Sequence, residues 1–184
     1  YSPARGYTPP DCLVEDFRRM QAVLGIEPNV IVQPSGYGTD NRCSLDAVRA
    51  LGIERSRGVA VIDDRTTDAE LDELHAAGFR GARFNMVSKG ALPFELLEAV
   101  AGRLADRGWH IQFFVNPDVL AAMARRFRSL PTEIVIDHMG HMDGRRGVDQ
   151  PGFRELLDLF ETDRCWVKLS GAYRGVTGPA PRPL

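Results

Sequence analysis

The chain has 184 residues, of which 43% are hydrophobic and 26% are charged, and its formal net charge is −2. This length suffices for one hydrophobic core, so a single domain over residues 1–184 is expected. Near-neutral charge without a long basic run argues against a nucleic-acid partner, and the apolar runs are too short to cross a membrane.

The cysteines and the opening residues bear on the compartment. Cys12, Cys43 and Cys165 are odd in number and widely spaced, which argues against a disulfide framework. The first ten residues are polar and turn-rich and do not have the pattern of a signal peptide. We therefore expect a reducing, cytoplasmic setting.

Apolar runs that read as strands alternate with amphipathic stretches that read as helices. The predicted helices are 11–24, with Asp11 as its cap, then about 41–51, 68–77, 93–107, 117–127 and 151–160, the last three with a proline in the first turn. Residues 139–150 and 171–184 read as loops. The predicted strands are 29–33, 58–62, 81–87, 109–115, 133–137 and 165–170. Their starts recur about every 25–30 residues, which is the spacing of a parallel βα sheet.

Polar residues follow or end almost every predicted strand, as in Ser35, Asp63, Asn85, Asn116, His138 and Ser170. Such a ring favours a barrel with its site at the carboxyl ends of the strands. The chain has no glycine-rich nucleotide-binding motif, which disfavours an open, doubly wound sheet without excluding it. A full barrel needs eight strands and six are predicted, so we expect an incomplete barrel; domain swapping is another alternative.

Several segments together carry a resemblance to a known family. They are Arg5–Pro9, Val32–Ser35, Gly38–Arg42, Gly81–Asn85, Val135–Gly140, and Trp166–Gly171 with Tyr173 and Arg174. The chain resembles the amidohydrolase-2 family of TIM-barrel hydrolases, and within it the 2-pyrone-4,6-dicarboxylate lactonase branch. The resemblance implies a (β/α)8 barrel of which strands two to seven are present here. The family's His-x-His pair and its terminal Asp, the general base, are not found in residues 1–184.

One catalytic and five substrate-binding positions are predicted. His138, at the end of a buried strand, can donate to a carbonyl oxygen and matches the family's histidine on this strand. Arg83 lies in an apolar strand, where its charge needs a partner such as a substrate carboxylate; a buried ion pair is the alternative. The resemblance adds Lys89 and Arg174 as carboxylate-binding residues, and Tyr7 and Ser35 as substrate contacts.

Two departures from the lactonase pattern bear on the substrate. Lys89 stands where the lactonases have an arginine, and Phe114 stands where they have a tyrosine. The lysine keeps the charge but loses the planar fork of the guanidinium, and the phenylalanine lacks a hydroxyl group. The fit to the dicarboxylate itself is weakened accordingly.

No cofactor and no metal site are expected, although a divalent metal stays open as an alternative. Gln112 and Asn116 stand near the end of the strand on which metal-dependent relatives carry a histidine, and His110 lies at its opposite end.

The predicted function is hydrolysis of a small carboxylated lactone, similar to 2-pyrone-4,6-dicarboxylate, by water-mediated ring opening. Alternatives are a metal-dependent decarboxylase or amidohydrolase of the same superfamily, and a non-catalytic truncated barrel. A homo-oligomer is compatible with each of them.

Overall fold

The computed structural model describes residues 1–3, 5–87 and 94–175. It divides into two compact units, residues 1–83 and 84–184, and each is described by itself. None of the helices in the described ranges is long and apolar enough to cross a membrane.

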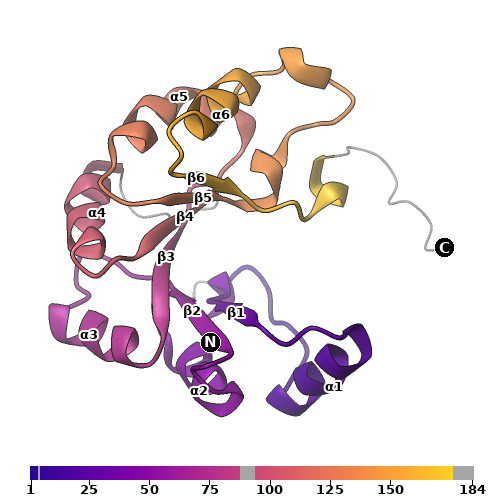
Figure 1. Cartoon of the computed structure of the whole chain (residues 1–184), viewed down its shortest axis with the longest axis vertical. Coiled ribbons are helices and arrows are strands. Elements are labelled where there is room, and N and C mark those ends of the chain that lie inside the picture. The colour runs from indigo at the N-terminus through magenta and orange to yellow at the C-terminus, as the bar shows by residue number, and fades with distance from the viewer. Residues whose placement is uncertain (4, 88–93, 176–184) are drawn as a thin grey trace. The chain divides into compact units, whose positions relative to one another are not determined.

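The first unit is a parallel sheet with helices between its strands (Figure 1). Its strands are β1 (Asn29–Val32), β2 (Ser56–Ala60) and β3 (Phe79–Asn85), whose last two residues belong to the second unit. β1 pairs with β2 and β2 pairs with β3, both in parallel. Its helices are α1 (Val14–Leu24), α2 (Arg42–Leu51) and α3 (Asp68–Ala76).

Apolar residues at helical spacing form the core of this unit. Val48 of α2 and Leu71 of α3 are fully buried. Gly58 of β2 leaves room for the buried ring of Phe79, because a Cβ at position 58 would lie 2.5 Å from that ring. Close packing of this kind is what fixes the register of neighbouring strands.

The predicted start of the first helix was wrong, and none of its faces is buried. α1 begins at Val14, and the carboxylate of Asp16 accepts a hydrogen bond from the amide of Leu13 at 2.8 Å, so Asp11 is not the cap. None of the residues of α1 is buried. Its apolar stripe therefore reflects the helical period without contributing a buried face in the described chain.

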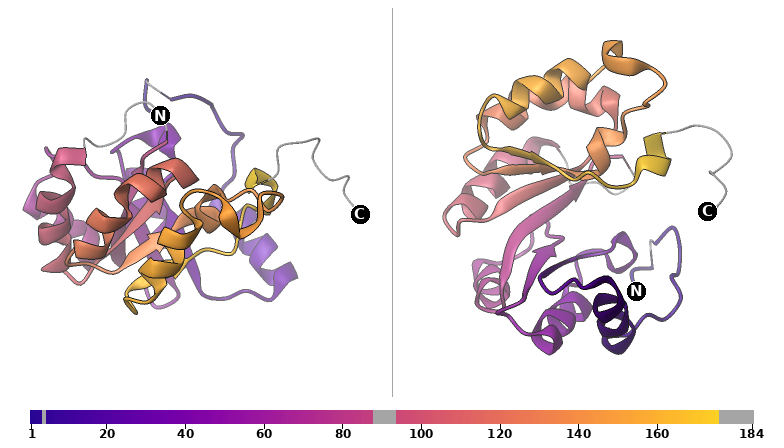
Figure 2. Two further views of the ribbon diagram at one scale, coloured as in Figure 1. Left: turned by 90° about the horizontal axis from the view of Figure 1, so that it is seen from above. Right: turned by 45° about the vertical axis from the view of Figure 1, so that its right-hand side comes forward.

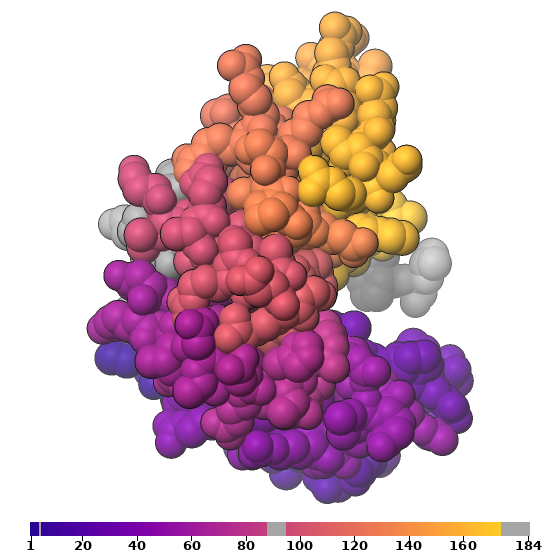
Figure 3. All heavy atoms as spheres, turned by 60° about the vertical axis from the view of Figure 1, so that its left-hand side comes forward, coloured from indigo at the N-terminus to yellow at the C-terminus, as the bar shows by residue number. Residues whose placement is uncertain are grey.

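The second unit repeats the same plan (Figure 2). Its strands β4 (His110–Phe114), β5 (Ile134–Ile136) and β6 (Cys165–Val167) pair in parallel and in that order. Its helices are α4 (Leu97–Ala105), α5 (Pro117–Ser129) and α6 (Phe153–Phe160). α5 and α6 lie side by side (Figure 1), and in Figure 3 the orange and yellow atoms of this unit adjoin one another.

Two layers follow from the alternation of side chains along β4. The ring of Phe113 stacks on Phe127 of α5, with centroids 4.1 Å apart, so odd-numbered side chains of this strand pack under the helices. Gln112 and Phe114 consequently point to the other face of the sheet. That face is where the candidate site lies.

The prolines predicted to open helices had different outcomes. Pro117 does occupy the first turn of α5, and the side chain of Asn116 caps that helix by accepting from the Val119 amide at 2.8 Å. Pro151 does not open α6, which begins at Phe153 after Gly152 with φ 78°. A Cβ at Gly152 would lie 2.4 Å from the Pro117 carbonyl oxygen, so the close approach of this carbonyl sets the start. Pro93 lies outside the described residues.

The last two strands are shorter than predicted. β5 ends at Ile136 and β6 at Val167, and the residues after them make site contacts instead of continuing the sheet. The segments predicted as loops contain three short 3-10 helices, at Asp137–His141, Gly147–Asp149 and Ala172–Gly175.

Candidate active site

The candidate site is built where the second unit's strands end. Directly after β5, His138, Met139 and Gly140 have φ values of 51°, 55° and 63°. This left-handed conformation costs a non-glycine residue about 1–2 kcal/mol, so it persists only where other contacts fix it. Two backbone bonds to Lys168 do so: its amide donates to the Ile136 carbonyl at 2.9 Å, and its carbonyl accepts from the Met139 amide at 3.1 Å.

The imidazole of His138 is held from the segment after β6. Its Nδ1 lies 3.0 Å from the Ser170 hydroxyl oxygen. If the hydroxyl donates to Nδ1, the ring hydrogen of the neutral imidazole sits on Nε2. Gly171 has φ 66°, and a Cβ there would lie 2.9 Å from Nδ1 of His138, so only glycine leaves this ring its position. The ring of Phe114 meets His138 edge-on, with centroids 5.8 Å apart.

A buried polar network lies beside His138. The Asp137 side chain is 2% exposed, and its carboxylate accepts from the Gln112 amide nitrogen at 3.0 Å and pairs with Lys168 Nζ at 3.2 Å. Lys168 Nζ also donates to the Gln112 amide oxygen at 2.8 Å. The three side chains thus form a closed ring of contacts between the middle of β4 and the residues that follow β5 and β6.

A second histidine stands close to the first. Nδ1 of His141 lies 2.6 Å from the Val115 carbonyl oxygen, and since a carbonyl only accepts, Nδ1 carries the hydrogen. The ring centroid lies 4.6 Å from that of Phe114 and 5.6 Å from that of His138.

Three predicted residues lie in the first unit. Ser35 is exposed and begins a 3-10 helix (Ser35–Tyr37) directly after β1. Tyr7 is about half exposed, and its carbonyl oxygen would lie 3.9 Å from a Cβ on Gly36, so the two predicted contact residues come from neighbouring segments. Arg83 is half-buried in β3.

The loop that carries Ser35 is organised by the buried Gln33. Its amide nitrogen donates to the carbonyls of Gly38 and Asp40, and its oxygen accepts from the Ser44 hydroxyl at 2.5 Å. The glycine-rich loop is therefore a shaped structure that ends on the first turn of α2.

The remaining predicted residues lie in or beside ranges that the structure leaves out. Lys89 is outside the described residues, and Arg174 is placed only by its backbone in the helix Ala172–Gly175. Arg83 and His138 belong to different units, so their convergence on one substrate stays a prediction. The same holds for the substrate-binding roles of Lys89, Arg174, Tyr7 and Ser35.

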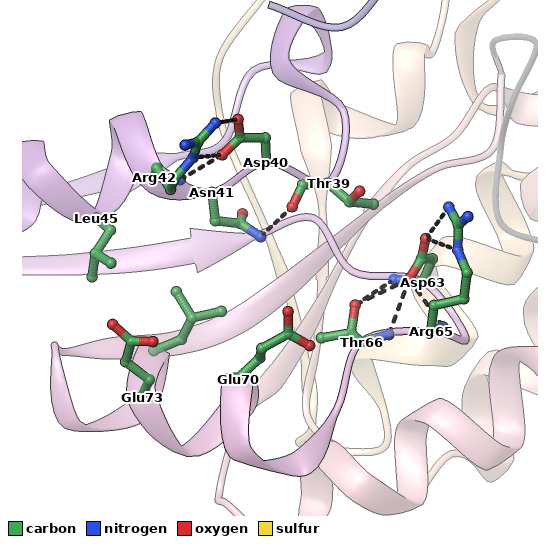
Figure 4. Close-up of a pocket in the computed structure, with 11 residues that line it drawn as sticks. Thr39, Asp40, Asn41, Arg42, Leu45, Asp63, Arg65, Thr66, Glu70 and Glu73 are labelled. Carbon is green, nitrogen blue, oxygen red and sulfur yellow. Dashed lines mark hydrogen bonds and ion pairs between the residues drawn. The ribbon is translucent and has the colours of Figure 1, made fainter.

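A polar depression of about 430 Å³ lies entirely within the first unit (Figure 4). It is lined by residues of α2, α3 and the loops after β1 and β2, and its two exposed arginines each pair with a nearby aspartate, Arg42 with Asp40 and Arg65 with Asp63. Asp63 also accepts from the amides of Arg65 and Thr66, which closes its loop. These contacts account for the loops' shapes, and none of the predicted site residues lines the depression.

The described donors do not fit a metal ion. In residues 1–3, 5–87 and 94–175, no group of three or more His, Cys, Asp or Glu side chains is arranged to hold one. Near His138, the Asp137 carboxylate is paired with the Lys168 ammonium group, which is an unsuitable neighbour for a cation site.

Parallel strands joined by helices define an α/β protein. Polar side chains gather at the carboxyl-terminal ends of its strands, where enzymes of this class have their active sites. A family model described as "Amidohydrolase" (Amidohydro_2) matches residues 1–183. The chain belongs to this amidohydrolase family, as its sequence motifs had predicted.

Two relatives illustrate the match. The 2-pyrone-4,6-dicarboxylate hydrolase of Comamonas testosteroni is 39% identical over 183 residues, covering 97% of this chain and 60% of the relative. The 4-sulfomuconolactone hydrolase of Rhizobium radiobacter is 37% identical over 182 residues, covering 95% and 59%. The chain thus spans about three fifths of the length of these relatives.

Solved structures give the fold independently. A Pseudomonas putida protein described as a 2-pyrone-4,6-dicarboxylic acid hydrolase aligns with a TM-score of 0.85 at 34% identity, over 96% of this chain and 65% of that one. An Acinetobacter baumannii structure described in the same terms, with citric acid bound, aligns with a TM-score of 0.84 at 28% identity, over 97% and 67%. The predicted α/β fold of TIM-barrel type, with six βα units, is confirmed.

Proposed function

We propose that this chain forms the larger part of a hydrolase that opens a small carboxylated lactone. The observation that carries the proposal is the placement of His138: a strained turn after β5 presents its imidazole, and Ser170 orients the ring through Nδ1. The two relatives described above are named as hydrolases of 2-pyrone-4,6-dicarboxylate and of 4-sulfomuconolactone, lactones that carry acidic groups, which supports this substrate class.

In the proposed reaction, water adds to the carbonyl carbon of the lactone ring. Negative charge builds on the carbonyl oxygen, and the Nε2–H of His138 donates to it, which requires Ser170 to donate to Nδ1. The ring C–O bond then breaks, leaving a new carboxylate and a hydroxyl or enol oxygen. The proton released by water passes to the aspartate that the family carries on its last strand, a motif that residues 1–184 do not contain.

Substrate binding is assigned to cations and two polar contacts. Arg83, Lys89 and Arg174 would pair with the carboxylates, because guanidinium and ammonium groups bind carboxylates through charge-assisted hydrogen bonds. Tyr7 and Ser35 would contact the ring or its substituents. The citric acid in the Acinetobacter baumannii structure supports a site of this charge preference in the family.

The ultraviolet absorbance of 2-pyrone-4,6-dicarboxylate, followed with the purified protein that carries this chain, tests the proposal. We expect loss of the pyrone absorbance, and we expect His138→Asn to slow it by about 100-fold or more, as removal of one oxyanion donor does. No turnover of this compound or of the sulfomuconolactone would reject the proposed substrate class.

Metal content separates the alternatives. One tightly bound metal that is essential for activity would favour the metal-dependent decarboxylase or amidohydrolase. A folded protein that turns over none of these substrates would favour the non-catalytic barrel. A place in the breakdown of aromatic compounds belongs to the same proposal, because it follows from the substrate class. A cytoplasmic location is proposed separately, from the cysteine content and the opening residues of the sequence.

A further inference from the structure

The network beside His138 suggests a role for residues that the family comparison does not assign. Asp137 is one residue away from His138 in sequence, and its carboxylate is 2% exposed. A carboxylate this deeply buried is tolerated only when charge and hydrogen bonds compensate it. Lys168 supplies the charge, and Gln112 supplies a hydrogen bond.

The contacts of this network fix the orientation of the Gln112 amide. The Gln112 amide nitrogen donates to Asp137 while its oxygen accepts from Lys168, so turning the amide over would break both bonds. Lys168 is 35% exposed, which leaves its charge partly solvated while Asp137 is enclosed. The pair is neutral as a whole, and its geometry is set by three strands at once.

The backbone of Lys168 also forms hydrogen bonds to the turn that carries His138. Its amide and carbonyl bond to Ile136 and Met139, the residues that flank Asp137 and His138. Its carbonyl accepts from the Ser170 amide as well, at 2.9 Å, so the residue that orients the His138 ring is tied to the same point. The left-handed backbone at His138 is therefore fixed by Lys168 on both sides.

We propose that Lys168, through its ring of contacts with Asp137 and Gln112, is a positioning residue that holds His138 in the orientation required to donate to the lactone carbonyl. This inference rests on the proposed function for the role of His138. Lys168 itself is not assigned a contact with the substrate. Its loss should therefore lower kcat while KM changes little, because substrate binding is assigned to other cations.

The test compares Lys168→Met with Arg164→Met in the purified protein. Arg164 is a suitable control because it precedes β6 and its guanidinium anchors the opposite end of that strand, donating to the carbonyls of Leu130 and Arg128. We expect Lys168→Met to lower kcat by about 10- to 100-fold, the loss that small misplacements of reacting groups produce, with KM within about threefold. Arg164→Met should leave kcat within about threefold, as expected for a residue remote from the reaction.

A second readout needs no substrate. With 15N-labelled histidine, the ring-nitrogen resonances of His138, identified by their loss in His138→Asn, should shift in Lys168→Met. Those of His75, which belongs to α3 of the first unit, should stay in place. An unchanged His138 signal together with an unchanged kcat would overturn the proposal; a shifted signal in a protein without lactonase activity would reject the function and leave the positioning role standing.

Two further variants cover a failure of Lys168→Met to fold. Asp137→Asn with Lys168→Met removes both charges, so it should fold, yet it should retain the low kcat and the shifted His138 signal because the contacts are lost. Recovery of the original kcat in this double variant would contradict the proposal. Lys168→Arg keeps the positive charge and can still donate to both Asp137 and Gln112, so kcat should stay within about threefold. A loss of kcat as large as that of Lys168→Met would contradict the proposal.

Discussion

The proposed catalytic position of His138 depends on residues to which no substrate contact is assigned. Lys168 holds its backbone, and Ser170 holds its ring nitrogen. Gly171 leaves room for the ring because it has no side chain. The segment after β6 supplies all three. Substitutions in this segment are therefore expected to act on the reaction through His138.

Gly171→Ala tests this dependence directly. Its Cβ would lie 2.9 Å from Nδ1 of His138, so the ring must move, and we expect kcat to fall by about tenfold or more. Gly147→Ala is the matched control, because Gly147 has nearly the same φ, 65°, with no atom within 4 Å of a built Cβ. Both variants should lose about 1–2 kcal/mol of stability from backbone strain, measured by urea unfolding, and only the first should lose kcat. Equal kcat values would show that the ring is not constrained there.

Arg83 is the residue on which the proposed carboxylate preference rests most strongly. Removal of a charge-assisted hydrogen bond to substrate costs about 1.5–3 kcal/mol, so Arg83→Met should raise KM for a carboxylated lactone by about 10- to 100-fold. Arg80→Met, in the same strand, is the control, because Arg80 bonds to the carbonyls of His75 and Phe79 at the strand's start. Thermal unfolding of both variants distinguishes the roles: a large loss of stability only in Arg83→Met would indicate a structural ion pair instead.

At the scale of elements, hydrophobic periodicity predicted each of the six α-helices and six strands that the structure describes, and it missed the short 3-10 helices. The boundaries were less accurate because they depend on partners distant in sequence. The Pro117 carbonyl decides where α6 begins, and Asp137 leaves the β5 ladder to join Lys168. A local pattern contains no information about either contact.

Only part of the site could be predicted, because some of its residues also depend on partners distant in sequence. His138 stood out as a polar residue that ends an apolar run. Lys168 did not, although it stands in the sixth predicted strand, because its importance comes from pairing with Asp137 across two strand ends. The alignment of the strand ends was the available signal. Because Ile136 pairs with Val167, the residue after each of them, Asp137 and Lys168, lies beside the other.

The loops after the strands carry their own charge pairs, and these predict an acid response. The guanidinium of Arg42 holds the pKa of the Asp40 carboxyl at about 2, below its ordinary 3.8. Because the pKa is lower in the folded state, this pair stabilises the fold above about pH 4, and the contribution is lost as the pH falls toward 2. We expect Arg42→Met to move the pKa of Asp40 back toward 3.8 in a carboxyl NMR titration.

Asp143 in the second unit is an internal control for that titration. Arg145 holds the pKa of its carboxyl at about 2 in the same way, and Arg42 belongs to the other unit. The Asp143 value should therefore stay unchanged in Arg42→Met. A parallel rise of both values would indicate a general loosening of the fold instead of the loss of one pair.

At the scale of the whole molecule, each unit exposes apolar side chains at its outermost strand or helix. Val23 of α1 is 85% exposed, and Leu169, directly after β6, is 84% exposed. β1 and β6 stand at the two ends of the strand order in the described chain. Exposed strand edges with apolar neighbours favour association with further protein surface.

We therefore expect residues 1–184, produced by themselves, to self-associate at micromolar concentration. Val23→Glu combined with Leu169→Glu should weaken the association by about tenfold or more in sedimentation experiments, since each places a charge in an apolar contact. Val148→Glu is the control, because Val148 is exposed in the short helix Gly147–Asp149, away from both strand edges. Association that is insensitive to the double variant would contradict this account.

The short length of β6 affects how the protein responds to heating. The strand is three residues long and stands at an end of the strand order, and such elements open locally well before a domain unfolds. Opening it would release Lys168, Ser170 and Gly171 together, while the stacked rings of Phe113 and Phe127 stay packed. The temperature range in which the protein functions would then be set by the fraying of this one strand, and backbone amide exchange at Lys168 would report it more directly than the melting of the core.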